Sequence, residues 1–158
     1  KKGAIVIDPD RDVKTTADSV VLFRSPSLQD FPKIEGNRVV IRGVGDYEVS
    51  AVKISGIASK DGVIYSIKID GMSLLLIEGS ILKKSQENLG ESQIVVVKAD
   101  EPLEAAKITA ISPNVVILYG GHALEIAKSL GKGSITPVSK YAATLEKLPE
   151  EMEVTVLE

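Results

Sequence analysis

Two short turn signals constrain the fold of this chain more than any other feature. Lys60-Asp61-Gly62 and Asp70-Gly71 each separate runs in which apolar and polar residues alternate. Asp-Gly pairs favour tight hairpin turns, and strict alternation is typical of half-buried strands. The middle of the chain is therefore expected to form consecutive β-hairpins. Within Tyr47–Ile57 the alternation changes phase at Ala51-Val52, which predicts a bulge or bend there.

The other expected elements follow from apolar runs and helix signals. Further strands are predicted at Ala4–Ile7, Val20–Phe23, Arg38–Arg42, Ile94–Lys98, Val115–Leu118, Ile135–Val138 and Val154–Leu157. Helices are predicted at Ser80–Leu89, Glu101–Ile111 and Ala123–Leu130, with Pro102 in the first turn of the second and Gly131 as the C-cap of the third. Hairpins followed by strand–helix–strand units indicate a layered α/β or α+β fold. With no repeat or linker in its 158 residues, the chain is expected to be a single domain over 1–158.

Composition excludes several classes of function. There is no cysteine, so disulfides, thiolate zinc sites and cysteine nucleophiles are absent. The net charge of −3 comes with no basic stripe, which argues against nucleic-acid binding. The longest apolar runs, such as Met72–Ile77, are too short to cross a bilayer, so no membrane association is expected. The lack of cysteine fits a reducing compartment, and we expect a cytoplasmic protein.

Six short segments, taken together and in order, carry a family resemblance. They are Ile5–Pro9, Ala17–Leu22, Gly43–Val49, Ile67–Leu74, Pro113–Ile117 and Leu148–Val154. In this order they resemble the small bacterial branch of the metallo-β-lactamase superfamily that is related to ascorbate-phosphate lactonases. The resemblance implies a four-layer αββα sandwich. The strand that usually precedes Asp8-Pro9 in this family is short or absent here.

The same resemblance implies that the metal site has been lost. The family holds zinc with a His-x-His-x-Asp-His loop, and at that place the chain reads Arg24-Ser25-Pro26-Ser27-Leu28-Gln29. The family's bridging Asp falls near Ile77-Glu78-Gly79, and its last His falls near Gly120, two residues before His122, the single histidine of the chain. Zinc needs three or more N, O or S ligands in a fixed shell. We therefore expect no metal and no cofactor, and no metal-activated water as nucleophile.

Four residues remain as candidate catalytic groups: Asp8, Arg24, Glu78 and His122. Three of them also have a structural interpretation. Asp8 fits a turn that follows a strand, and Arg24 could fill the space of a lost cation. His122 fits the start of a helix, and a catalytic histidine would need an orienting partner that the sequence does not identify.

Two functions from different classes remain open. The first is a non-catalytic binding or assembly module that works as a homo-oligomer or with a protein partner. A short or missing first strand would expose a sheet edge that a partner strand could cover. The alternative is a hydrolase with a divergent or metal-free active site built from the four candidates. Their gathering around one open pocket would favour the enzyme, whereas a site plugged by Phe23, Leu28 and Leu76 would favour the module.

Overall fold

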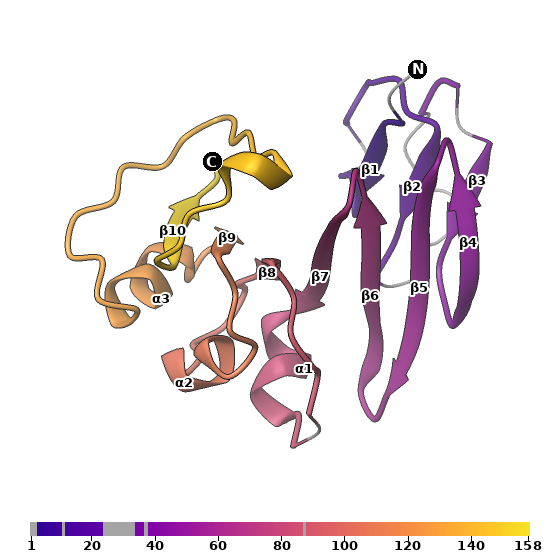
Figure 1. The fold of residues 1–158 in the computed structure, drawn as a ribbon. Helices are drawn as coiled ribbons and strands as arrows, with labels where there is room; N and C mark the ends of the chain where they lie inside the picture. Colours follow the sequence, from indigo (N-terminus) through magenta and orange to yellow (C-terminus); the bar gives the residue numbers. More distant parts are fainter. Residues whose placement is uncertain (1–2, 11, 24–33, 37, 87) are drawn as a thin grey trace. The chain divides into compact units, whose positions relative to one another are not determined.

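The structure is a computed structural model and describes residues 3–10, 12–23, 34–36, 38–86 and 88–158. The chain divides into two compact units, Lys1–Tyr65 and Ser66–Glu158, and strand β6 (Gly62–Ile69) contains the boundary between them (Figure 1). Each unit is described by itself below. The mixed α/β class expected from the pattern of strands and helices is confirmed. The expectation of one domain over 1–158 stays a prediction.

The first unit contains a small parallel sheet. Its strands are β1 (Ile5–Ile7), β2 (Ser19–Val21) and β3 (Val39–Ile41), in the order β1-β2-β3. Strand β2 is fully buried, and Val20 and Leu22 form a core cluster with Ala17 and Ile34. A continuous apolar run buried on both faces is the usual composition of a central parallel strand. The three strands predicted in this part of the chain are therefore confirmed, each a little shorter than expected.

A tight hairpin follows in the same unit, and it corrects one prediction. Strands β4 (Gly45–Val49) and β5 (Val52–Ser59) pair antiparallel, with Val49 opposite Val52. The bulge or bend predicted at Ala51-Val52 is instead a two-residue turn made by Ser50 and Ala51, and the change of phase marks the point where the chain reverses. Their φ angles are 50° and 64°, the positive pair that a type I′ hairpin turn requires. Neither residue is the Asn or Gly that usually marks such a turn, so the residue types did not predict the turn.

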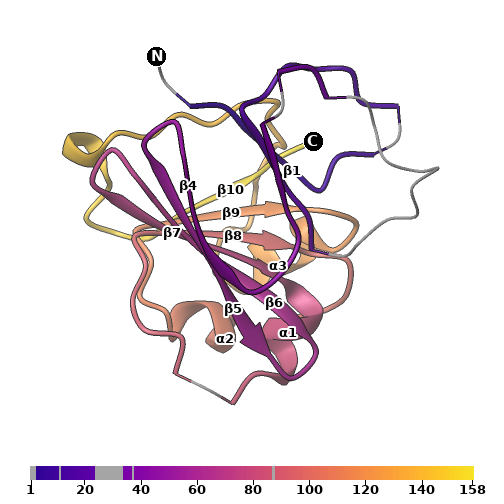
Figure 2. The same ribbon diagram turned by 90° about the vertical axis from the view of Figure 1, so that its right-hand side faces the viewer.

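The second unit is built on a larger parallel sheet. Its strands β7 (Met72–Glu78), β8 (Ile94–Lys98), β9 (Val115–Tyr119) and β10 (Glu153–Val156) lie in the order β10-β9-β8-β7 (Figure 2). The turn before β7 is the predicted one: Asp70 and Gly71 have φ angles of 49° and 78°. The predicted strand Ile135–Val138 is wrong. Only Val138 forms a bridge there, to Leu157, and Pro137 has no N–H to donate to a ladder.

Three short helices complete this unit, and two are shorter than predicted. They are α1 (Gly79–Lys84), α2 (Ala105–Thr109) and α3 (Ala123–Ser129), and a 3₁₀ turn, η1, covers Leu145–Lys147. Helix α2 begins after an extended Glu104, so Pro102 lies before the helix and not in its first turn. Helix α3 agrees with its prediction, and Gly131 follows it with a φ of 85°. No helix in the described part of the chain is long and apolar enough to span a membrane.

Helix packing fixes the ends of the parallel strands. Helix α1 packs on β7, and α3 packs on β9 and β10. Buried apolar side chains on these helices include Ile81, Leu82, Ile126 and Ala127. Each helix begins within four residues of the end of a strand, except α2, which begins seven residues after β8. The loops at the carboxyl ends of the strands are therefore short and held in place.

Candidate functional site

A row of three polar residues marks the carboxyl edge of the parallel sheet. Glu78, Lys98 and Tyr119 are the last residues of β7, β8 and β9, and they are paired in register. Residues paired in register point to the same side of a sheet. Glu78 is buried, and the side chain of Lys98 is 26% exposed. Ligands of open α/β sheets bind outside the carboxyl ends of the strands, so this edge is the natural place to look for a site.

The loops that follow β8 and β9 are tied to each other by backbone hydrogen bonds. The N–H of Ala99 donates to the carbonyl of Tyr119 at 2.7 Å, and the N–H of His122 donates to the carbonyl of Ala99 at 2.8 Å. Lys98 reaches into the same loop, with its Nζ 3.8 Å from Oδ2 of Asp100. These bonds leave little freedom in the backbone at this edge.

Gly120 occupies a position in this edge that admits no side chain. Its φ is 107°, a conformation that L side chains rarely adopt. A Cβ built there would lie 2.8 Å from Oδ1 of Asp100 and 2.9 Å from the carbonyl oxygen of Ala99. Gly79, at the start of α1, is also tight, since its Cβ would lie 3.1 Å from the carbonyl oxygen of Lys98. The resemblance places a bridging aspartate near Ile77-Glu78-Gly79 and a histidine near Gly120.

The residues at this edge therefore do not fit a zinc ion. No group of three His, Cys, Asp or Glu side chains that could hold a metal is found among the residues the structure describes. At Gly120 the obstacle is the backbone itself, because a ligand side chain placed there would overlap Asp100 and Ala99. The loop from Arg24 to Gln29 lies outside the described residues.

His122 has the orienting partner that the sequence did not reveal. It is the N-cap of α3, and its Nδ1 lies 2.8 Å from Oε2 of Glu125. An ionised carboxylate can only accept hydrogen bonds, so a hydrogen bond between these atoms requires a proton on Nδ1 of His122. The signal was present as a spacing of three residues at a helix start, which places two side chains on one face. Both side chains are well exposed, at 36% and 66%.

The structure places three of the four predicted residues, two of them in the second unit and one in the first. Glu78 and His122 share the carboxyl edge of the sheet, but the strand β8 separates β7 from β9. Asp8 belongs to the first unit, where it follows β1 with a φ of 43° and its N–H donates to the carbonyl of Val21. Arg24 lies outside the described residues.

Two of the three side chains expected to fill a non-catalytic site are buried, one in each unit. Phe23 packs on Tyr65 with ring centroids 6.2 Å apart, and the Tyr65 hydroxyl donates to the carbonyl of Leu22 at 2.7 Å. Burial raises the pKa of Tyr65 above its usual value. Leu76 is buried within β7, and Leu28 lies outside the described residues.

A pocket of about 450 Å³ opens beside the start of α3. Its lining is Gly120, Gly121, Ala123, Leu124, Thr136, Pro137, Val156, Leu157 and Glu158. His122 lies between two lining residues but does not line the pocket itself. The histidine–glutamate pair and the cavity are therefore neighbours that do not form one reaction site.

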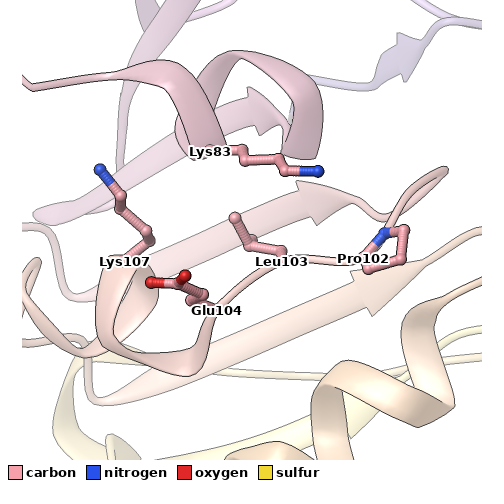
Figure 3. A pocket seen from close by; sticks show the side chains of 5 residues that line it. All are labelled: Lys83, Pro102, Leu103, Glu104 and Lys107. Carbon is pink, nitrogen blue, oxygen red and sulfur yellow. The ribbon is translucent and has the colours of Figure 1, made fainter.

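A second pocket, of about 320 Å³, lies between α1 and α2 (Figure 3). Leu103 stands between Lys83 and Lys107, with Pro102 and Glu104 beside it (Figure 3). Both lysines already bind acceptors of the chain: Nζ of Lys107 donates to the carbonyl of Ser85 at 2.7 Å, and Nζ of Lys83 lies 3.4 Å from Oε2 of Glu101. Both ammonium groups of this pocket therefore have an acceptor within the chain, and Glu104 adds a carboxylate to the lining.

The strand order and a comparison with a solved structure together show a metallo-β-lactamase-like fold. The chain is similar over 97% of its length to the crystal structure of a Thermotoga maritima protein described as a candidate Zn-dependent hydrolase of the metallo-β-lactamase superfamily. The match covers 88% of that protein, with a TM-score of 0.69 and 21% sequence identity. At this identity the likeness concerns the fold alone. No protein-family model and no curated protein matches the chain.

Proposed function

We propose that this chain is a non-catalytic domain of metallo-β-lactamase-like fold that serves as a binding or assembly module in the cytoplasm. The observation that carries the proposal is Gly120. Near the place of the family's last histidine, Gly120 has a φ of 107°, and a Cβ built on it would lie 2.8 Å from Asp100 and 2.9 Å from Ala99, so the backbone leaves little room for a ligand side chain. In the proposed role the protein needs no zinc and no other cofactor, and it acts with a protein partner or with a second copy of itself.

The test is the metal content of the purified protein. The chain is stripped with a chelator, incubated with excess zinc, iron or manganese, desalted, and measured by elemental mass spectrometry. We expect less than about a tenth of an equivalent to be retained, because a zinc site needs three or more converging ligands. Retention near one equivalent would contradict the proposal and return hydrolase chemistry to first place.

A hydrolase with a divergent, metal-free site is the second candidate, and the His122–Glu125 pair favours it. A histidine whose Nδ1 is held by a carboxylate resembles the base and orienting group of many hydrolytic sites. Hydrolysis of activated carboxylic and phosphate esters is measured for the unchanged protein, for His122→Asn and for the matched surface variant Lys128→Asn. Turnover that disappears only in His122→Asn would support the enzyme. Turnover that is absent, or equal in all three proteins, would reject it.

A further inference from the structure

The outer side of strand β4 is an open sheet edge whose hydrogen-bonding groups can be assigned. Strand β4 is the last in its sheet, and β5 pairs with it on one side only. Among the described strands, none pairs with its other side. Such an edge presents unpaired backbone N–H and C=O groups to any extended chain that fits.

The register determines which residues of β4 present these groups. The two-residue turn at Ser50 and Ala51 makes Val49 and Val52 a hydrogen-bonded pair. Pairs alternate along an antiparallel ladder between hydrogen-bonded and non-hydrogen-bonded. Counting back from Val49, the backbone groups of Glu48 and Asp46 therefore face away from β5, toward the open side.

The side chains of these two residues add a charge pattern to the edge. Asp46 and Glu48 are both exposed. They lie on one face of the hairpin, because Asp46 pairs with Ser55, whose Oγ donates to its Oδ1 at 2.7 Å, and Glu48 pairs with Lys53. The edge thus carries two carboxylates at alternate positions.

An apolar patch stands at the end of the same hairpin. Val44 and Ile57 are 62% and 48% exposed. They flank the last pair of the hairpin, since Val44 precedes Gly45 and Ile57 follows Gly56, the partner of Gly45. An edge with paired acids and an adjacent apolar patch fits an extended segment with basic and apolar side chains at alternate positions.

A second copy of this chain does not fit the edge. Antiparallel pairing of β4 with itself about Tyr47 would set Asp46 of one copy opposite Glu48 of the other. Parallel self-pairing would set each acid opposite its own counterpart. Like charges directly opposite each other destabilise a strand pair, so the edge favours a different protein.

We propose that the open edge of β4 binds an extended segment of a partner protein by β-strand addition, with two basic residues opposite Glu48 and Asp46 and an apolar residue against Val44 and Ile57. The inference rests on the proposed binding role and names its surface and the chemistry of its partner. Antiparallel addition gives the more stable ladder. In that direction the segment reads basic, basic, apolar at every second position.

The experiment titrates the full chain with a synthetic peptide and follows backbone amide resonances by NMR. The probe is Thr-Lys-Thr-Lys-Thr-Ile-Thr, and its control has glutamate in place of both lysines. We expect the lysine peptide to shift the amides of residues 44–48, with an affinity that falls as salt is added. The glutamate peptide should leave them unchanged. No shift with the lysine peptide at about 1 mM, a concentration at which even weak complexes form, would overturn the proposal.

Two variants separate the roles of charge and backbone. The double variant Asp46→Lys with Glu48→Lys should bind the lysine peptide at least about tenfold more weakly, because each attractive cross-strand pair becomes repulsive. Glu48→Pro removes one outward N–H and keeps the bonds to β5, since proline is tolerated on the open side of an edge strand. It should also lose binding, while the control Lys53→Glu should keep or strengthen it. Unchanged affinity in the charge-reversed variant would refute the assignment.

Each failure can be told apart from failure of the proposed function. If the protein retains no metal and does not bind the peptide, only the inference about β4 is contradicted. If the protein retains stoichiometric zinc and still binds the peptide at residues 44–48, the inference about β4 stands and the proposed non-catalytic role is contradicted. Sedimentation of the unchanged chain adds a further check, because a dimer that Glu48→Pro dissolves would show that the edge binds a second copy.

Discussion

Replacing Gly120 by alanine should destabilise the protein far more than the same change one residue later. At Gly120 the φ of 107° is strained for any residue with a Cβ, and the new Cβ would meet Oδ1 of Asp100 at 2.8 Å and the backbone of Ala99 at 2.9 to 3.0 Å. The aspartate side chain can turn away, but the Ala99 backbone is held by its hydrogen bonds to Tyr119 and His122. Backbone strain of this kind costs about 1–3 kcal/mol and the overlap adds to it, so we expect a loss of about 2–4 kcal/mol.

The measurement is urea unfolding followed by circular dichroism, with Gly121→Ala as the matched control. A Cβ at Gly121 has nothing within 4 Å, so this variant should stay within about 0.5 kcal/mol of the unchanged protein. Adding Asp100→Ala to Gly120→Ala should recover only part of the loss, because the contacts with Ala99 remain. Equal losses for the two glycine variants would refute the steric reasoning, and with it the main support for a metal-free edge.

Three further predictions test other parts of the fold. Burial raises the pKa of Tyr65, so the stability that the protonated tyrosine contributes is fully present below the usual pKa of 10.0 and is lost as the pH rises through the raised value. The free energy of unfolding should therefore fall above about pH 10, and it should fall less in Tyr65→Phe. The double change Ser50→Asn with Ala51→Gly should raise stability by about 1 kcal/mol in urea, because both positions have positive φ, and no gain would argue against the hairpin. Leu118→Ala, in a fully buried strand position, should cost about 2–5 kcal/mol, and a calorimetric melting temperature within 2 °C, roughly what 1 kcal/mol produces, would contradict that burial.

The sequence predicted the elements with strong local signals and missed those that depend on tertiary structure. Asp70-Gly71 was found because the dipeptide itself favours positive φ. Ser50 and Ala51 adopt the same backbone without such residues, so their turn could be read only as a phase change. The helix expected over Ser80–Leu89 ends at Lys84 instead, where Ser85 is extended, because periodicity marks the existence of a helix better than its ends.

The candidate site was predictable in its location and not in its details. Family spacing led to Glu78 and to the vicinity of Gly120, and both lie at the carboxyl ends of parallel strands. The row with Lys98 could not be seen, because it depends on the register between β7 and β8. Glu125 was within reach of the sequence, since it lies three residues after a histidine expected to open a helix. The conformation of Gly120 depends on contacts with a neighbouring loop, so the residues next to it in the sequence could not predict it.

The glycine at position 120 also limits the evolutionary routes open to this chain. A single codon change that introduced histidine there would create a chemically suitable ligand in a backbone that rejects it. The loop that contains Ala99 and Asp100 would have to move first, and such a change brings no catalytic advantage until the histidine follows. Placing a histidine at position 120 would therefore need coordinated changes in two loops, whereas exposed positions such as those on β4 can vary one at a time.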